Sequence, residues 1–169
     1  AKEVDVNIPY RLQDDKAEAD RSMGAIHYAS RNGHLSIVKA LVENYDADPT
    51  QRDNHGLTPF MRAVKHGEID VADYLLQRPG VSINDKDSNG RTALVRTMAA
   101  SEEPNIEAAR WLVQHNANLD LKDNDGRTAL DWANQESDSI VDLLKQFQTN
   151  CLDTDIFGQL QTFLFTWHL

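Results

Sequence analysis

Residues 53–76 of this chain read DNHGLTPFMRAVKHGEIDVADYLL. Gly56 supplies a residue that accepts positive φ in a tight turn, and Thr58 followed by Pro59 fits the capping and first positions of a helix. Apolar residues at i, i+3 and i+4 then predict one short helix before Gly67 and a second helix after it. A turn with two short helices cannot bury its own apolar faces. The unit therefore needs copies of itself to fold.

Copies of this unit recur along the chain at a nearly constant interval. The pattern Asp-x-x-Gly-x-Thr begins at Asp53, Asp87 and Asp123, and its glycines are 34 and 36 residues apart. Upstream, residues 26–29 align with residues 60–63 at a shift of 34. A period of roughly 33 residues, made of a turn, a TPLH-like box and two helices, resembles the ankyrin repeat.

The resemblance covers most of the chain and implies an all-α fold, an ankyrin-repeat α-solenoid. Each repeat would be a helix-turn-helix unit with a β-hairpin or turn, and the family implies a non-enzymatic, protein-binding role. Val4–Asn7 is similar to the hairpin that closes an ankyrin repeat, so we expect the chain to begin partway through an array. The predicted organisation is an N-terminal hairpin, cap or linker (1–22), four repeats (23–52, 53–86, 87–122 and 123–148) and a C-terminal capping or docking helix (149–169).

The copies are not identical, and each departure predicts a local difference. Gly24 stands at the capping position of the first repeat, where the later copies have Thr. Met61 replaces the box histidine, which in the first repeat is His27 and in the family hydrogen-bonds backbone between repeats. One such bond is therefore expected to be missing. About three residues are inserted within the third repeat, as a recognition loop or a tolerated surface change, and Ser101 or Asn105 is expected to cap the next helix.

The fourth repeat and the tail depart furthest from the pattern. Asp131 stands at the box-histidine position with Trp132 beside it. Apolar residues at helical spacing between Ile156 and Trp167 predict an amphipathic helix without Lys or Arg. That helix either caps the last repeat or docks a partner, including a second copy of this chain through residues 155–169. The missing basic residues argue against an interfacial membrane helix.

Composition argues against several classes of protein. The net charge of −10 disfavours nonspecific binding to nucleic acid or to an anionic membrane, and no apolar run reaches the ~18 residues of a membrane span. A single cysteine, Cys151, and the lack of an apolar leader favour a cytoplasmic or nuclear location. The six histidines form no zinc-like spacing, and no phosphate-binding glycine motif occurs. We therefore expect no catalytic residue, no cofactor and no metal site.

The predicted function is a protein-interaction module, a scaffold or adaptor. In the family, ligands meet the hairpin tips and the inner face of each first helix, and the matching positions here include seven Lys or Arg residues. This excess predicts an acidic or phosphorylated partner segment. The alternatives are an ankyrin-type inhibitor of a partner enzyme and a targeting fragment of a larger multidomain or effector protein. The candidate partner-binding residues are Arg31, Asn32, Arg52, Asn54, His55, Leu57, Lys65, His66, Lys86, Ser88, Asn89, Arg91, Lys122, Asn124, Asp125 and Arg127.

Overall fold

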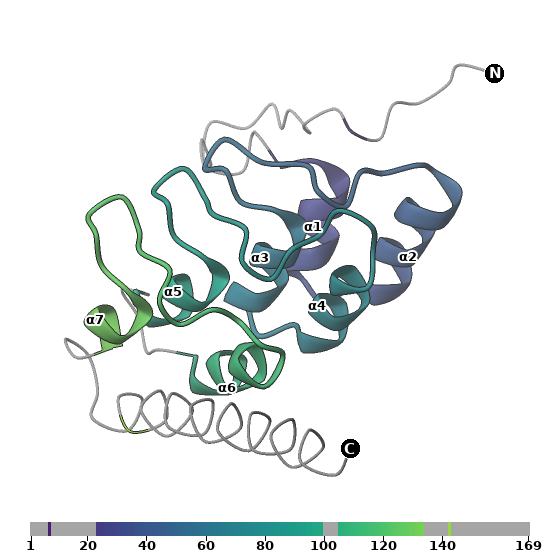
Figure 1. The fold of residues 1–169 in the computed structure, drawn as a ribbon. Helices are drawn as coiled ribbons and strands as arrows, with labels where there is room; N and C mark the ends of the chain where they lie inside the picture. The colour runs from purple at the N-terminus through teal and green to yellow at the C-terminus, as the bar shows by residue number, and fades with distance from the viewer. Residues whose placement is uncertain (1–6, 8–22, 100–104, 134–141, 143–169) are drawn as a thin grey trace, which may run out of the picture.

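The structure is a computed structural model that describes Asn7, residues 23–99, residues 105–133 and Asp142 (Figure 1). Within these residues it contains seven α-helices and no strand. The helices are α1 (Ala25–Arg31), α2 (Leu35–Asn44), α3 (Pro59–Lys65), α4 (Ile69–Leu76), α5 (Ala93–Met98), α6 (Ile106–Gln114) and α7 (Ala129–Ala133).

The helices form two layers. The first helices of successive repeats, α1, α3, α5 and α7, pack against one another in chain order, and α2 and α4 pack side by side in the second layer. The connections that enter α3, α5 and α7 project to the same side as parallel loops (Figure 1). The core between the layers includes Phe60, Leu75, Leu94 and Leu112, which are all fully buried. The predicted all-α solenoid is confirmed.

The helix starts follow the capping chemistry of the sequence. Thr58 Oγ1 accepts the backbone N–H of Met61 at 3.2 Å, and Thr92 caps α5 in the same way. Gly24, at the equivalent position of the first repeat, has no side chain to do this. Of the two candidates after the insertion, Asn105 caps α6, because its side-chain oxygen accepts the backbone N–H of residue 108 at 3.0 Å.

The box histidine joins the first repeat to the second. His27 is fully buried, and its Nε2 lies 2.9 Å from the carbonyl oxygen of Gln51 and 3.1 Å from that of Leu57. Burial lowers the pKa of His27, although the nearby carboxylate of Asp53 opposes the shift. Met61 occupies the same place in the second repeat, and its buried thioether has no N–H to donate. Met61 therefore cannot make the bond between repeats that His27 makes.

The projecting loops are tied to each other by backbone hydrogen bonds at their tips. The N–H of Ser88 donates to the carbonyl oxygen of His55, and the N–H of Asn124 donates to that of Asn89, both at 3.0 Å. These bonds bring successive tips so close that a glycine is needed beside each bond. At Gly90 an added Cβ would lie 2.8 Å from the backbone nitrogen of Asn124.

Asn7 touches the connection between the first and second repeats. Its side-chain oxygen accepts the backbone N–H of Asp48 at 3.0 Å, as Asn84 accepts the N–H of Asn118 at 2.9 Å. The domain boundaries predicted above remain a prediction. The rest of residues 1–22, Ser101 with most of the insertion, and the tail helix with its self-association through 155–169 lie outside the described residues.

The glycines of the tips offer a matched test of the contact between repeats. Gly56, Gly90 and Gly126 all have a positive φ, of 72°, 73° and 78°. A Cβ added at Gly56 or Gly90 would meet the next loop, whereas one added at Gly126 would have no described atom within 4 Å. Gly126→Ala should therefore cost only the left-handed strain, about 1–2 kcal/mol. We expect Gly56→Ala and Gly90→Ala to lower the free energy of unfolding in urea clearly more. Equal losses at the three positions would show that contact between tips contributes nothing.

Candidate protein-binding face

A buried aspartate organises the base of each projecting loop. Asp53 is 7% exposed, and its Oδ1 accepts the backbone N–H of His55 at 2.8 Å and of Leu57 at 2.9 Å. Its Oδ2 accepts Nε–H of Arg62, nine residues later on α3, at 2.8 Å. One carboxylate therefore folds the turn and fastens it to the inner helix.

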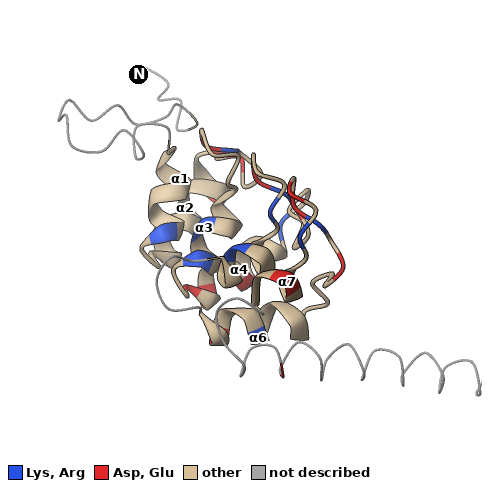
Figure 2. Cartoon of the chain, turned by 90° about the vertical axis from the view of Figure 1, so that its left-hand side faces the viewer, with Lys and Arg blue, Asp and Glu red and all other residues tan. Residues whose placement is uncertain are grey.

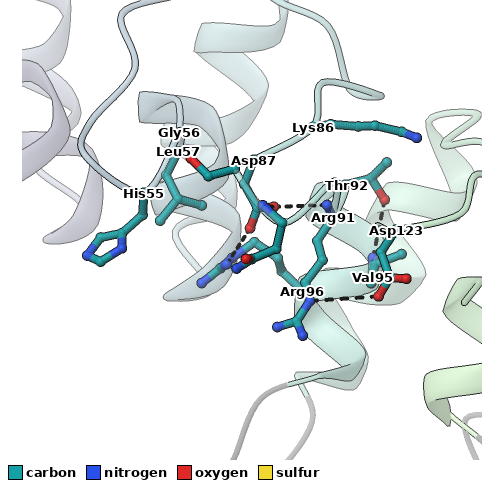
Figure 3. A network of polar contacts seen from close by, with 12 residues as sticks. His55, Gly56, Leu57, Lys86, Asp87, Arg91, Thr92, Val95, Arg96 and Asp123 are labelled. Carbon is teal, nitrogen blue, oxygen red and sulfur yellow. Dashed lines mark hydrogen bonds and ion pairs between the residues drawn. The ribbon is translucent and has the colours of Figure 1, made fainter. Parts of the chain in front are cut away.

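The same arrangement recurs in the next two repeats. Asp87 accepts the backbone N–H of Arg91 at 2.9 Å, and Arg96 donates to its second oxygen at 2.6 Å (Figure 3). Asp123 likewise accepts two backbone N–H groups, those of Asp125 and Arg127. Its side-chain partner nine residues later is Trp132, whose Nε1–H donates to Asp123 at 2.8 Å. We call Asp53, Asp87 and Asp123 the turn aspartates. Their side-chain partner must be an N–H donor, but it need not be charged.

Hydrogen bonding keeps the carboxylates of Asp53 and Asp123 ionised. Burial alone would raise the pKa of Asp53, but the hydrogen bond from Arg62 and those from the backbone outweigh it, and the pKa falls below its usual 3.8. Burial is likewise overcome at Asp123, whose pKa is lowered chiefly by the backbone N–H of Arg127 and the indole of Trp132. Both aspartates are therefore charged in the folded protein near neutral pH.

The basic residues at the loop bases bind their own neighbours. Arg52 Nη1 donates to the carbonyl oxygens of Gly56, at 3.0 Å, and of Lys86, and its Nη2 lies 3.4 Å from Asp85. Lys86 Nζ donates to the carbonyl oxygen of Lys122 at 2.7 Å. These side chains therefore connect successive repeats. The carbonyl contacts leave their positive charge in place, whereas Asp85 offsets part of it.

A second basic group gathers at the ends of the inner helices. Arg31 and Lys65 lie in the last turns of α1 and α3, and Asn32 and His66 follow those helices directly. Because α1 and α3 pack together, their ends are neighbours. The pKa of His66 is lowered, first by burial and then by the positive charges of Arg31, Lys65 and Arg62. Arg31 and Lys65, from two repeats, thus place positive charge beside His66.

The loop tips are polar rather than strongly basic. Figure 2 shows Lys and Arg interleaved with Asp and Glu along the projecting loops, so the excess of positive charge there is smaller than a count of candidate residues suggests. Leu57 has to be removed from the candidate face, because it is 2% exposed and its side chain belongs to the core. The exposed candidates at the tips are Asn54, His55, Ser88, Asn89, Asn124 and Asp125.

Sequence reasoning missed the ion-pair partner of Arg52 and the side chains that donate to the turn aspartates. Asp85 was not connected with Arg52, and the donors to the turn aspartates were not recognised. The signal that could have found these donors is spacing, since the ninth residue after each turn aspartate is Arg, Arg or Trp. Among the described residues no cluster of His, Cys, Asp or Glu could hold a metal ion, and no described helix is long and apolar enough to cross a membrane.

Comparison with known proteins agrees with this architecture. Residues 5–87 and 79–155 match the family model described as ankyrin repeats, three copies. The chain belongs to the ankyrin-repeat family. Ankyrin repeats generally mediate protein–protein interaction, and such domains are typically non-catalytic binding modules.

The relatives are much longer proteins. The chain is 31% identical over 93% of its length to a palmitoyltransferase AKR1 of Lachancea kluyveri, and 31% identical over 68% to a putative palmitoyltransferase ZDHHC13 of Danio rerio. It is 30% identical over 69% of its length to Rabankyrin-5 of Mus musculus. It spans 21%, 17% and 10% of these relatives, respectively. The similarity therefore concerns only a limited part of each of them.

The turn aspartates predict a specific response to acid. Because the folded-state pKa of Asp53 is below its unfolded value, its contribution to stability is present above about pH 4 and is lost as the pH falls through the folded pKa. Asp53→Asn leaves the Arg62 guanidinium buried without its counter-charge, so we expect a loss of about 3 kcal/mol at pH 7. Urea unfolding measured between pH 7 and pH 3 should also show a weaker acid dependence than in the native chain.

The control is Asp125→Asn, which removes a carboxylate that is 62% exposed from a neighbouring position of the same kind of turn. Its stability at pH 7 should match that of the native chain. An Asp53→Asn variant that unfolds in acid as the native chain does would contradict the assigned role of the turn aspartates.

Proposed function

We propose that this chain binds an acidic or phosphorylated segment of a partner protein along the loop tips and the ends of the inner helices. We call this surface the recognition face, and it comprises the exposed tips and basic residues described above. The observation that carries the proposal is the position of Arg31 and Lys65 in the last turns of two inner helices that pack together, beside His66. A positive region on a chain of net charge −10 favours an anionic segment and orients its approach.

The same cations also have an internal role, which the test must separate from binding. Arg31 and Lys65 lie at helix C-termini, where positive charge stabilises the helix dipole by about 0.3–1 kcal/mol per residue. Reversing their charge therefore costs some stability. The cost is small compared with the stability of a folded domain, so binding can be compared among folded variants.

A second candidate is a targeting role within a longer protein. The length of the relatives favours it, since this chain spans 21% of the Lachancea kluyveri palmitoyltransferase and 17% of the Danio rerio one. In that case the recognition face would select the protein on which the rest of the longer polypeptide acts. Both candidates use the same surface and predict the same binding partner.

The test compares charge reversals on the two layers of the stack. A partner captured from lysate at low salt is purified and its affinity measured by calorimetry. Arg31→Glu with Lys65→Glu should weaken binding by about tenfold or more, and added salt should weaken it in the native chain. The matched control is Lys39→Glu with Arg110→Glu, which changes the same charge at exposed positions of α2 and α6. We expect no effect from the control pair.

The opposite result would overturn the proposal. If the partner binds the Arg31→Glu, Lys65→Glu protein normally and fails to bind the control protein, the outer helices carry the binding site. Thermal unfolding of both proteins, measured in parallel, shows that each is folded at the binding temperature.

A further inference from the structure

Two arginines share one aromatic ring at the last described loop. The guanidinium carbon of Arg91 lies 4.6 Å from the ring centroid of Trp132, and that of Arg127 lies 4.7 Å from it. Arg91 comes from the third repeat and Arg127 from the fourth. A guanidinium that stacks on an aromatic ring is held in orientation, and its N–H groups are left for a ligand in the plane of the guanidinium.

The exchange of arginine for tryptophan leaves the turn aspartate of the fourth repeat without a hydrogen-bonded guanidinium group. In the second and third repeats the turn aspartate forms an ion pair with Arg62 or Arg96. In the fourth repeat Asp123 accepts the indole N–H of Trp132 instead, and its other oxygen accepts two backbone N–H groups. The indole takes the place of the guanidinium that pairs with the other turn aspartates, and Arg91 lies 3.9 Å from the carboxylate of Asp123.

Each arginine has a long ion pair with an acid, and neither pair is close enough for a hydrogen bond. Arg91 Nε lies 3.9 Å from Asp123, beyond hydrogen-bonding range, and this buried Nε has no hydrogen-bond partner in the described part of the chain. Arg127 Nη2 lies 3.9 Å from Asp125, whose side chain is 62% exposed and therefore able to turn away. Lys86 adds a further positive charge, since its ammonium group binds the carbonyl oxygen of Lys122, the residue before Asp123.

We propose that Arg91 and Arg127, held on Trp132, bind the phosphate group of a phosphorylated serine or threonine in the partner segment. This inference rests on the proposed function and names the ligand of one part of the recognition face. A phosphate carries a charge of about −1.5 to −2 and three acceptor oxygens, so it can bind two guanidinium groups at once. A carboxylate has one charge and two oxygens and matches only one of them.

The test uses the full chain and a short probe, the peptide N-acetyl-Gly-phosphoserine-Gly-amide. The chain has three tryptophans, and the indole N–H signal of Trp132 in a ¹⁵N-correlated NMR spectrum is assigned by its disappearance in Trp132→Phe. We expect the probe to shift this signal in a saturable way, because the indole contacts both arginines and hydrogen-bonds Asp123. The unphosphorylated peptide should leave it unchanged, and the peptide with Glu should bind about tenfold more weakly.

Variants decide which groups are responsible. Arg91→Ala and Arg127→Ala should each weaken probe binding by about tenfold, whereas Arg110→Ala, which removes an exposed arginine from α6, should not change it. Arg127→Lys keeps the charge but loses the planar, two-pronged donor and should also bind more weakly. The inference is overturned if the Trp132 signal does not respond to millimolar probe, or if it responds equally in the native and Arg91→Ala, Arg127→Ala proteins.

Failure of this inference can be told apart from failure of the proposed function. If a phosphatase-treated partner binds as tightly as the untreated one, and still requires Arg31 and Lys65, the recognition face stands and the phosphate assignment is wrong. If binding does not depend on Arg31 and Lys65 either, the proposed function itself is wrong.

Discussion

The structure depends on one buried interaction that is used three times, the hydrogen bonding of a turn aspartate. Each turn aspartate closes a tight turn through two backbone N–H groups and holds the inner helix through a donor nine residues later. This interaction fixes the angle at which each loop leaves its helix. Only with that angle fixed can the tip of one loop meet the next, as in the bond from Ser88 to His55. The turn aspartate thus orders the loop within its own repeat, and the ordered loop then hydrogen-bonds the loop of the next repeat.

The donor can change because the aspartate requires an N–H group and not a charge. Arg62 and Arg96 neutralise their carboxylates, whereas Trp132 only hydrogen-bonds its own. Tryptophan at this position removes one positive charge and provides an aromatic ring that Arg91 and Arg127 contact. The fourth repeat thus keeps the hydrogen bond to its turn aspartate while the charge beside that aspartate changes.

The sequence predicted the parts of the fold that are determined locally. A glycine for positive φ and a hydroxyl at a helix start act within a few residues, and Thr58 and Gly56 behave as their types require. The candidate site was harder to predict, because the hydrogen-bond and ion-pair partners of a basic side chain lie about one repeat away in the sequence. Arg52 bonds the carbonyl oxygen of Lys86, a contact that exists only after the repeats have stacked. Leu57 was misplaced for the same reason, since its turn position suggested exposure and the stack buries it.

Apart from Trp132, which hydrogen-bonds a turn aspartate and contacts two arginines, the residues that stabilise the loops differ from those that we propose to bind a partner. In the second to fourth repeats the turn aspartate and its donor face inward, and the exposed tip residues between them face outward. Because each repeat of such a stack contacts only its neighbours, an exposed residue can change without a long-range effect on folding. The arrangement makes the two roles separable by position. A substitution at a turn aspartate should alter unfolding whatever the partner, whereas one at Arg31, Lys65 or Arg127 should alter the choice of partner in a stack that still folds.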